Sequence, residues 1–261
     1  MQTQTFSGKS DPVVRKISVA DVGEVLAEGV RDFQRAPVYG VLTGGICAIV
    51  GLLLILAVYA AGMPYLAYPL AAGFALVCPF LAAGLYEVSR RLEKDESLAP
   101  GEVWGSVRSR SEIRWMGFMT LFVLIVWLYQ VRLLMALFLG ESGMGVTFGD
   151  VFDTIFGTSE GLLFLLVGNV VGAILATILF SLSAVSFPLV VDRDVDFVTA
   201  MITSVRAVGT NPIPMFVWAV IIVAWLAVSA MTFFLGLIVV LPILGHATWH
   251  LYRRVVAPET D

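Results

Sequence analysis

Charge and cysteine are both scarce in this chain. Charged residues account for 14% of the 261 residues and apolar residues for 59%, whereas a soluble domain usually carries about 25% charge. The two cysteines, Cys47 and Cys78, lie inside apolar runs and form no CxxC pair, which argues against a disulfide framework and a cysteine-based zinc site. The formal net charge of −4 includes no basic excess, so nothing indicates nucleic acid as a partner.

Sequence motifs of catalysis are also missing. The chain contains no Walker loop, no GxSxG nucleophile motif and no pair of carboxylates inside an apolar run. Its only two histidines stand four residues apart near the C-terminus. We therefore expect a protein that is not an enzyme.

Six long apolar runs make up most of what is present, and the mean hydropathy is +0.91. A membrane-spanning helix needs about 20 apolar residues. The first run begins after a polar segment with charges of both signs, which does not resemble a cleavable signal peptide. In order, the predicted spans are Val38–Gly62, Tyr65–Tyr86, Trp115–Leu139, Leu162–Val190, Pro214–Val228 and Thr232–Trp249. We predict an all-α polytopic membrane protein with six transmembrane helices arranged as three hairpins.

Each hairpin follows a stretch whose apolar residues recur at helical spacing. The first stretch begins with Ser18 and Asp21, which fit a capping box with Asp in place of the usual Glu or Gln. These stretches are too interrupted to cross a bilayer, so we predict amphipathic helices lying at the cytoplasmic membrane surface. A soluble partner helix is the alternative for the first stretch.

A fourth amphipathic helix is predicted near residues 147–157, in a loop that has acidic but no basic residues. Thr147 and Asp150 form a plausible capping pair in front of it. The predicted domain organisation is a mobile N-terminal tail over 1–17, one transmembrane domain over 18–256 and a C-terminal tail over 257–261.

The basic residues sort to one side of the predicted membrane. Of the 16 Lys and Arg, all but Arg132 lie in the N-terminal segment, the loops 87–114 and 189–213, and the C-terminal tail. Cytoplasmic loops carry an excess of Lys and Arg. We therefore predict that both termini are cytoplasmic.

The segments on that side also resemble one another. Residues 79–91 align without gaps on residues 242–254, each running from Pro to Arg-Arg, and Arg31–Pro37 matches Arg206–Pro212 in spacing. These matches predict a pseudo-threefold repeat with units of about 18–92, 97–193 and 194–256. The alternative is that basic residues and proline commonly end membrane helices.

Arg132 lies inside the third predicted span, and Asn169 lies at a similar depth in the fourth. Arginine near the centre of a bilayer costs about 2.5–3.5 kcal/mol, so it needs a partner or a path to the interface. The functional interpretation is a polar intramembrane site for an anion or a lipid headgroup. The structural interpretation is an arginine that reaches the interface and is tied to its neighbours.

His246 and His250 share one helix face, a spacing that holds a metal only if further ligands converge. Two histidines of one helix cannot bind a haem from opposite sides, and the HATWH sequence lacks the acid of an HExxH motif. We therefore expect no cofactor and no metal. Instead we predict a row of interfacial anchors formed by Trp249, His250, Tyr252, Arg253 and Arg254.

Two pairs of glycines are spaced four residues apart within predicted spans. Small residues at this spacing let membrane helices approach closely. The predicted packing positions are Gly40, Gly44, Gly168 and Gly172.

Three motifs carry a resemblance to a known family. They are the sequences Phe187–Asp196, Ser204–Met215 and Gly245–Arg254. They resemble an uncharacterised bacterial multipass inner-membrane family, domain of unknown function 2189, from the first amphipathic stretch onward and most strongly towards the C-terminus. The resemblance implies a six-helix protein of the bacterial inner (cytoplasmic) membrane and supplies no catalytic residues.

Three functional hypotheses follow. The first is a non-enzymatic integral membrane protein that contacts the lipid bilayer and binds a membrane-protein partner, or forms a homo-oligomer, as an accessory or assembly subunit. The second is a small-solute or lipid transporter that uses Arg132 and Asn169. The third is a membrane enzyme that binds haem at His246 and His250.

Overall fold

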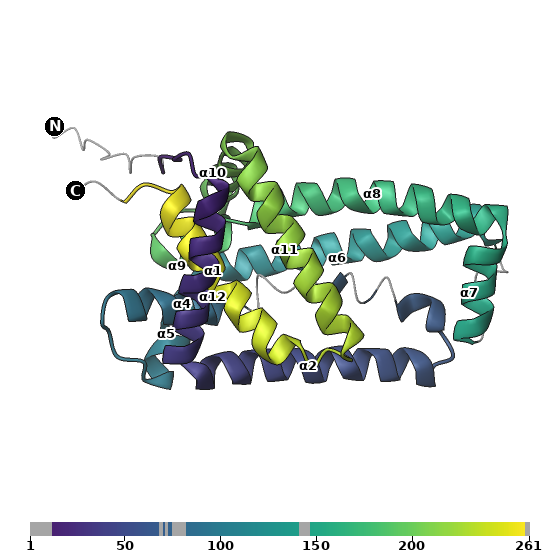
Figure 1. Ribbon diagram of the computed structural model, residues 1–261, viewed down its shortest axis with the longest axis horizontal. Helices are drawn as coiled ribbons and strands as arrows, with labels where there is room; N and C mark the ends of the chain where they lie inside the picture. The colour runs from purple at the N-terminus through teal and green to yellow at the C-terminus, as the bar shows by residue number, and fades with distance from the viewer. Residues whose placement is uncertain (1–11, 68–69, 71–72, 75–81, 141–146, 259–261) are drawn as a thin grey trace, which may run out of the picture.

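The computed structural model describes residues 12–67, 70, 73–74, 82–140 and 147–258. Over these residues the chain is helical, with one isolated bridge and no strand. Three long helices run along the longest axis of the molecule, namely α2 (Pro37–Ala60), α6 (Ser111–Phe138) and α8 (Ser159–Ser183) (Figure 1). The remaining elements are α1 (Val19–Arg35), a 3-10 turn (Pro64–Leu66), α4 (Ala83–Glu93), α5 (Pro100–Ser109), α7 (Phe148–Gly157), α9 (Ser186–Asp192), α10 (Phe197–Thr210), α11 (Pro212–Met231) and α12 (Leu237–Val255).

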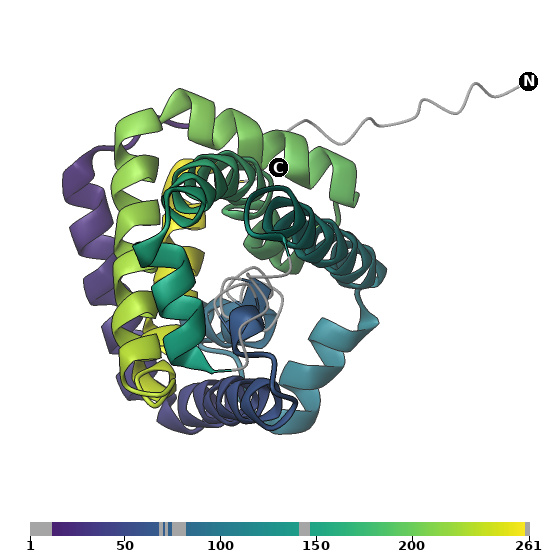
Figure 2. The same cartoon turned by 90° about the vertical axis from the view of Figure 1, so that its right-hand side faces the viewer.

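Three short helices stand directly before three long ones. A single residue separates α1 from α2, α5 from α6 and α10 from α11, and these residues are Ala36, Arg110 and Asn211. Before α2 and α11 the break has a local cause, because the residue preceding a proline avoids the α region and proline suits the first helical position. The three predicted amphipathic stretches are thus helical, and Figure 2 shows them on three different sides of the molecule.

Both predicted capping boxes are confirmed. The Ser18 hydroxyl accepts from the backbone N–H of Asp21, and the Asp21 carboxylate accepts from the backbone N–H of Ser18. Thr147 and Asp150 make the same reciprocal pair at the start of α7. In Figure 1, α7 lies at the end of the molecule opposite the chain termini.

Within the described residues, four helical stretches are long and apolar enough to cross a membrane. They are α2, α6, the combined α8 and α9, and α11. Half of the second predicted span, Tyr65–Tyr86, lies outside the described residues. The sixth, Thr232–Trp249, is not among the four, because the helix begins at Leu237 and continues through the polar turns up to Val255.

The last hairpin, formed by α11 and α12, reaches only partway along the length of α2. A Cβ placed on Gly44 would collide with the backbone of Leu237 and Ile238, and one placed on Gly51 would lie 2.8 Å from the Phe234 ring. Gly51 is about 21 Å from the start of α2, a helix of about 36 Å. The turn between α11 and α12 therefore packs against the middle of α2, and both helices run obliquely to it (Figure 1).

The fourth predicted span was expected to continue as one helix to Val190, but it is broken at Ala184 and Val185. Pro188 explains the break, because its ring clashes with the carbonyl four residues earlier in a continuous helix. Residues 186–191 of α9 are buried, whereas most of α8 is not.

The main buried core lies at the end of the molecule that holds the chain termini. Its largest side chains include Trp218, Trp249, Tyr252 and Leu189. Residues 12–17, the described part of the predicted mobile tail, lie at this end and are hydrogen-bonded to the helical part of the chain. Val14 pairs with Val256, and the Asn211 side chain bonds the backbone at Arg15 and Ile17.

Candidate functional site

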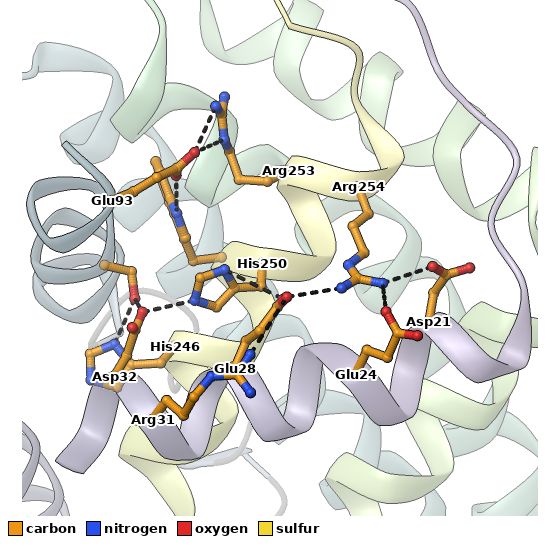
Figure 3. Close-up of polar contacts among 12 residues, drawn as sticks. Asp21, Glu24, Glu28, Arg31, Asp32, Glu93, His246, His250, Arg253 and Arg254 are labelled. Carbon is orange, nitrogen blue, oxygen red and sulfur yellow. Dashed lines mark hydrogen bonds and ion pairs between the residues drawn. The ribbon is translucent and has the colours of Figure 1, made fainter. Parts of the chain in front are cut away.

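The last turns of α12 place a row of polar side chains between α1, α4 and α9 (Figure 3). Arg254 points towards α1, where its guanidinium lies 2.8 Å from Asp21, 2.6 Å from Glu24 and 2.9 Å from Glu28. Charge-assisted pairs of this kind are short and directional. Arg254 therefore ties the end of the chain to three successive turns of α1.

The neighbouring side chains point the other way, towards α4 and α9. Arg253 pairs with Glu93 at 2.9 Å and with Asp192 at 3.3 Å. The Tyr252 hydroxyl donates to Asp192 at 2.6 Å, and the Trp249 indole N–H donates to Glu93 at 3.1 Å. Trp249 and Tyr252, predicted as interfacial anchors, are fully buried, and their polar atoms are bonded to other helices of the protein.

His246 and His250 meet Asp32 through a short chain of hydrogen bonds. Ser89 Oγ lies 2.7 Å from Asp32 Oδ2 and 2.7 Å from His246 Nδ1, while His250 Nε2 lies 2.8 Å from the same Asp32 oxygen. His250 Nδ1 faces Glu28 at 3.6 Å. The two histidines, which share a helix face in the sequence, are thus both linked to one carboxylate of α1.

The ionisation of Asp32 decides the direction of these bonds. Burial disfavours its charged form, but hydrogen bonds from His250 and Ser89 outweigh burial and hold the pKa of Asp32 below its usual value. An ionised carboxylate only accepts, so Ser89 donates its proton to Asp32 and accepts from Nδ1–H of His246. Nε2 of His246 is then the bare nitrogen, and this buried atom has no hydrogen-bond partner.

A cavity of about 290 Å³ opens beside this chain of bonds. Three helices supply its walls, with Asp32 and His250 among the lining side chains. The full lining is Glu28, Arg31, Asp32, Arg35, Glu93 and His250.

Glu87 of α4 forms a second charged cluster. Its fully buried carboxylate bonds Arg90 at 2.8 Å and Arg91 at 2.8 Å. Burial disfavours the charge of Glu87, but these arginines outweigh it and hold the pKa of the carboxyl below its usual value. Both arginines also reach exposed acids of the following loop and helix, Glu96 and Glu102.

Sequence reasoning missed Asp32 and Ser89 as partners of the histidines, and Glu93 as the partner of Trp249 and Arg253. They lie on other helices, and 218 positions separate Asp32 from His250. One local signal was present, because Asp32 continues the buried stripe of α1 after Val25 and Gly29. A carboxylate in line with an apolar stripe predicts a buried partner.

The other predicted site residues lie on the long helices. Arg132 and Asn169 are both exposed, no described hydrogen bond joins them, and the Asn169 amide donates to Leu165 of its own helix. Gly40 lies against Phe33 and Pro242, whereas Gly168 and Gly172 face α6, with Trp127 at 3.5 Å from a Cβ built on Gly172. Across the described residues, no group of three or more His, Cys, Asp or Glu is arranged to hold a metal ion.

Within the described residues, four helices long and apolar enough to cross a membrane define a class, the multi-pass helical integral membrane proteins. Residues 67–192 match the family model described as "Predicted integral membrane protein (DUF2189)". This match confirms the predicted resemblance to that family over residues 67–192. It includes the first of the three quoted motifs as far as Asp192 and leaves the other two outside. Comparisons with curated proteins and with solved structures find no match.

Proposed function

We propose that this protein works without catalysis, by binding another membrane protein as an accessory or assembly subunit. The observation that carries the proposal is the surface of the α6–α8 hairpin. In the most apolar 18-residue stretch of each span, 0% of the α8 span and 11% of α6 is buried, against 28% of α2 and 22% of α11. The hairpin thus has the smallest buried share among the four candidate spans of the described residues.

Six of the exposed apolar residues of α6 form a continuous stripe. Their spacing of three and four residues follows one face of a helix, the pattern by which helices pack side by side. The stripe consists of Phe118, Phe122, Val126, Tyr129, Leu133 and Leu137. A partner helix seated on this stripe would cover several aromatic side chains, which are frequent anchors of protein interfaces.

The finer topology belongs to the same proposal. We propose six membrane passes in three hairpins, a pseudo-threefold repeat, a bacterial inner-membrane location and cytoplasmic termini. The three short helices that precede α2, α6 and α11 support the repeat. The pairing of Val14 with Val256 supports termini on one side, since it brings both described ends together.

A transport function is the second candidate, and the exposure of Arg132 on an apolar helix favours it. A cation there needs a counter-charge or a polar ligand. Under this hypothesis Arg132→Ala abolishes uptake while leaving expression intact. Unchanged uptake would exclude Arg132 as a transport site.

Bulky apolar substitutions test the partner proposal. Ile174→Trp on α8 keeps the surface apolar, so fluid lipid tolerates it, whereas a packed partner helix clashes with the larger ring. We expect this variant to reach the membrane normally and to lose its partner during affinity purification. The matched control is Ile46→Trp, at a similarly exposed position of α2. Equal partner recovery from both variants would contradict the proposed surface.

A further inference from the structure

We propose that the cavity between α1, α4 and α12 binds the phosphoethanolamine headgroup of a membrane phospholipid. The phosphate would meet Arg31 and Arg35, and the ammonium would meet Asp32. This inference does not rest on partner binding by the α6–α8 hairpin, because it concerns a different part of the molecule.

Two arginines at the mouth of the cavity are available for a phosphate. Arg31 and Arg35 stand one helical turn apart, so both side chains reach the same side of α1. The nearest acid to Arg31 is Glu28 at 3.9 Å, and the Arg31 side chain is 64% exposed. Arg35 makes no hydrogen bond or ion pair within the described residues. Two guanidinium groups at this spacing suit a phosphate.

One carboxylate oxygen deeper in the cavity is available for an ammonium. Both described hydrogen bonds to Asp32, from Ser89 and His250, end on Oδ2. Each carboxylate oxygen accepts about two hydrogen bonds, and Oδ1 receives none within the described part of the chain. Glu28 and Glu93 also line the cavity, and each already pairs with an arginine of α12. A primary ammonium, with three donors, fits this end of the cavity.

The position of the cavity suits a lipid headgroup rather than an acyl chain. Arg35 lies two residues before Pro37, where the apolar α2 begins. The cavity therefore lies where a membrane span meets the polar end of the protein, and the adjoining residues of α2 that face outward are apolar, namely Val38, Val41 and Leu42. A phospholipid at this boundary would place its tails along α2 and its headgroup in the cavity.

The mixture of charges predicts which headgroup binds. Phosphatidylcholine has a bulkier quaternary ammonium without an N–H, so it cannot donate to Asp32. Phosphatidylglycerol has no cation, so it would leave Oδ1 of Asp32 without a charged donor. Phosphatidylethanolamine alone among the three offers both a phosphate and a hydrogen-bonding cation.

Native mass spectrometry of the full-length protein tests the proposal. The protein is released from nanodiscs that contain equal amounts of phosphatidylethanolamine, phosphatidylcholine and phosphatidylglycerol, and the retained lipids are counted. We expect phosphatidylethanolamine to be retained about tenfold more than either other lipid, which corresponds to about 1.4 kcal/mol. Equal retention of the three lipids, or a preference for phosphatidylglycerol, would overturn the proposal.

Matched variants locate the site. The double variant Arg31→Gln and Arg35→Gln removes exposed charges without disturbing the core, so it should fold and lose the preference for phosphatidylethanolamine. Arg108→Gln is the control, because Arg108 is also an exposed arginine on a short helix before a span. A preference that survives the double variant, or is lost equally in the control, would place the lipid elsewhere.

The same headgroup chemistry occurs in the phospholipid and in free phosphoethanolamine, and adding the free compound distinguishes the two ligands. If the ligand is the lipid, millimolar phosphoethanolamine leaves the unfolding temperature of the detergent-solubilised protein unchanged, while added phosphatidylethanolamine raises it. A rise with the free compound alone would overturn the assignment to a lipid.

Discussion

Glu87 shows how one side chain ties together the charges at the polar end of the protein. It is fully buried, yet it accepts hydrogen bonds from Arg90 and Arg91, whose side chains are only 12% and 11% exposed. Removing one partner from such a cluster leaves the other charges buried without compensation. The charge of Glu87 is therefore linked to the stability of α4.

Glu87→Gln should lower the free energy of unfolding by about 3–5 kcal/mol, the usual cost of breaking a buried ion pair. Thermal unfolding in detergent measures the effect. Glu102→Gln is the control, because Glu102 also pairs with Arg91 but is 56% exposed, and exposed pairs contribute about 0–1 kcal/mol. Equal effects of the two variants would contradict the account of the cluster.

The same residue predicts a pH dependence. Because the pKa of Glu87 is lower in the folded protein than its usual value of 4.5, its stabilisation is complete above that value. The stabilisation is lost as the pH falls through the folded pKa. The difference in unfolding temperature between the parent and Glu87→Gln should therefore be constant at neutral pH and shrink at acidic pH. A difference that grows on acidification would contradict the assigned charge state.

We expect a smaller loss of stability when Ser89 is replaced. Ser89→Ala leaves Nδ1–H of His246 buried without an acceptor, which costs about 1–3 kcal/mol. Ser109→Ala, at an exposed position of α5, should change stability by at most about 0.5 kcal/mol. Chemical or thermal unfolding of the two variants side by side measures the difference. Indistinguishable curves would show that the Asp32–Ser89–His246 chain does not stabilise the fold.

At the scale of the elements, close packing between α2 and α12 sets the position of the last hairpin. The Cβ of an alanine at position 44 would lie 2.7 Å from the Cα of Ile238. Backbone atoms cannot move aside as the end of a side chain does. The hairpin therefore has to shift if Gly44 gains a side chain.

Gly44→Ala should destabilise the protein by about 1–3 kcal/mol, as overpacking does. Gly45→Ala is an adjacent control, because a Cβ there has no neighbouring atom within 4 Å. The control should be neutral or up to about 1 kcal/mol stabilising, since alanine favours a helix over glycine. Unfolding temperatures in detergent test the pair, and a loss of stability in Gly45→Ala alone would refute the packing geometry.

The elements that the sequence predicts best are those with local signals. Ser18 with Asp21 and Thr147 with Asp150 each fix a helix start within four residues, so both helices could be predicted. The break before α9 has a local cause in Pro188, but proline near a membrane boundary does not by itself specify where a helix stops. The depth of the last hairpin could not be predicted, because hydropathy records the length of an apolar run and not its tilt.

The polar site was harder to predict for a different reason. Trp249, Tyr252 and the following arginines look like an interfacial belt, because aromatic and basic residues mark the ends of membrane helices. Trp249 and Tyr252 are instead buried, and their polar atoms donate to Glu93 and Asp192, which belong to other helices. Only the assembled fold brings these acids to the end of α12.

At the scale of the whole molecule, the polar and apolar parts are separated along its length. Ion pairs join α1, α4, α9 and α12 at the end that holds the termini, while α6 and α8 extend towards α7 with their apolar sides uncovered (Figure 1). This division predicts a rigid polar end and a hairpin available to a partner within the membrane.

Native mass measurement of the protein, gently extracted from its own membranes, tests partner binding most directly. The chain alone has a mass of 28.3 kDa. The account predicts a larger complex that contains a second membrane protein in fixed proportion, and loss of that protein from Ile174→Trp but not from Ile46→Trp. A mass of one chain with lipids, or only multiples of the chain's own mass, would contradict a role as an accessory subunit.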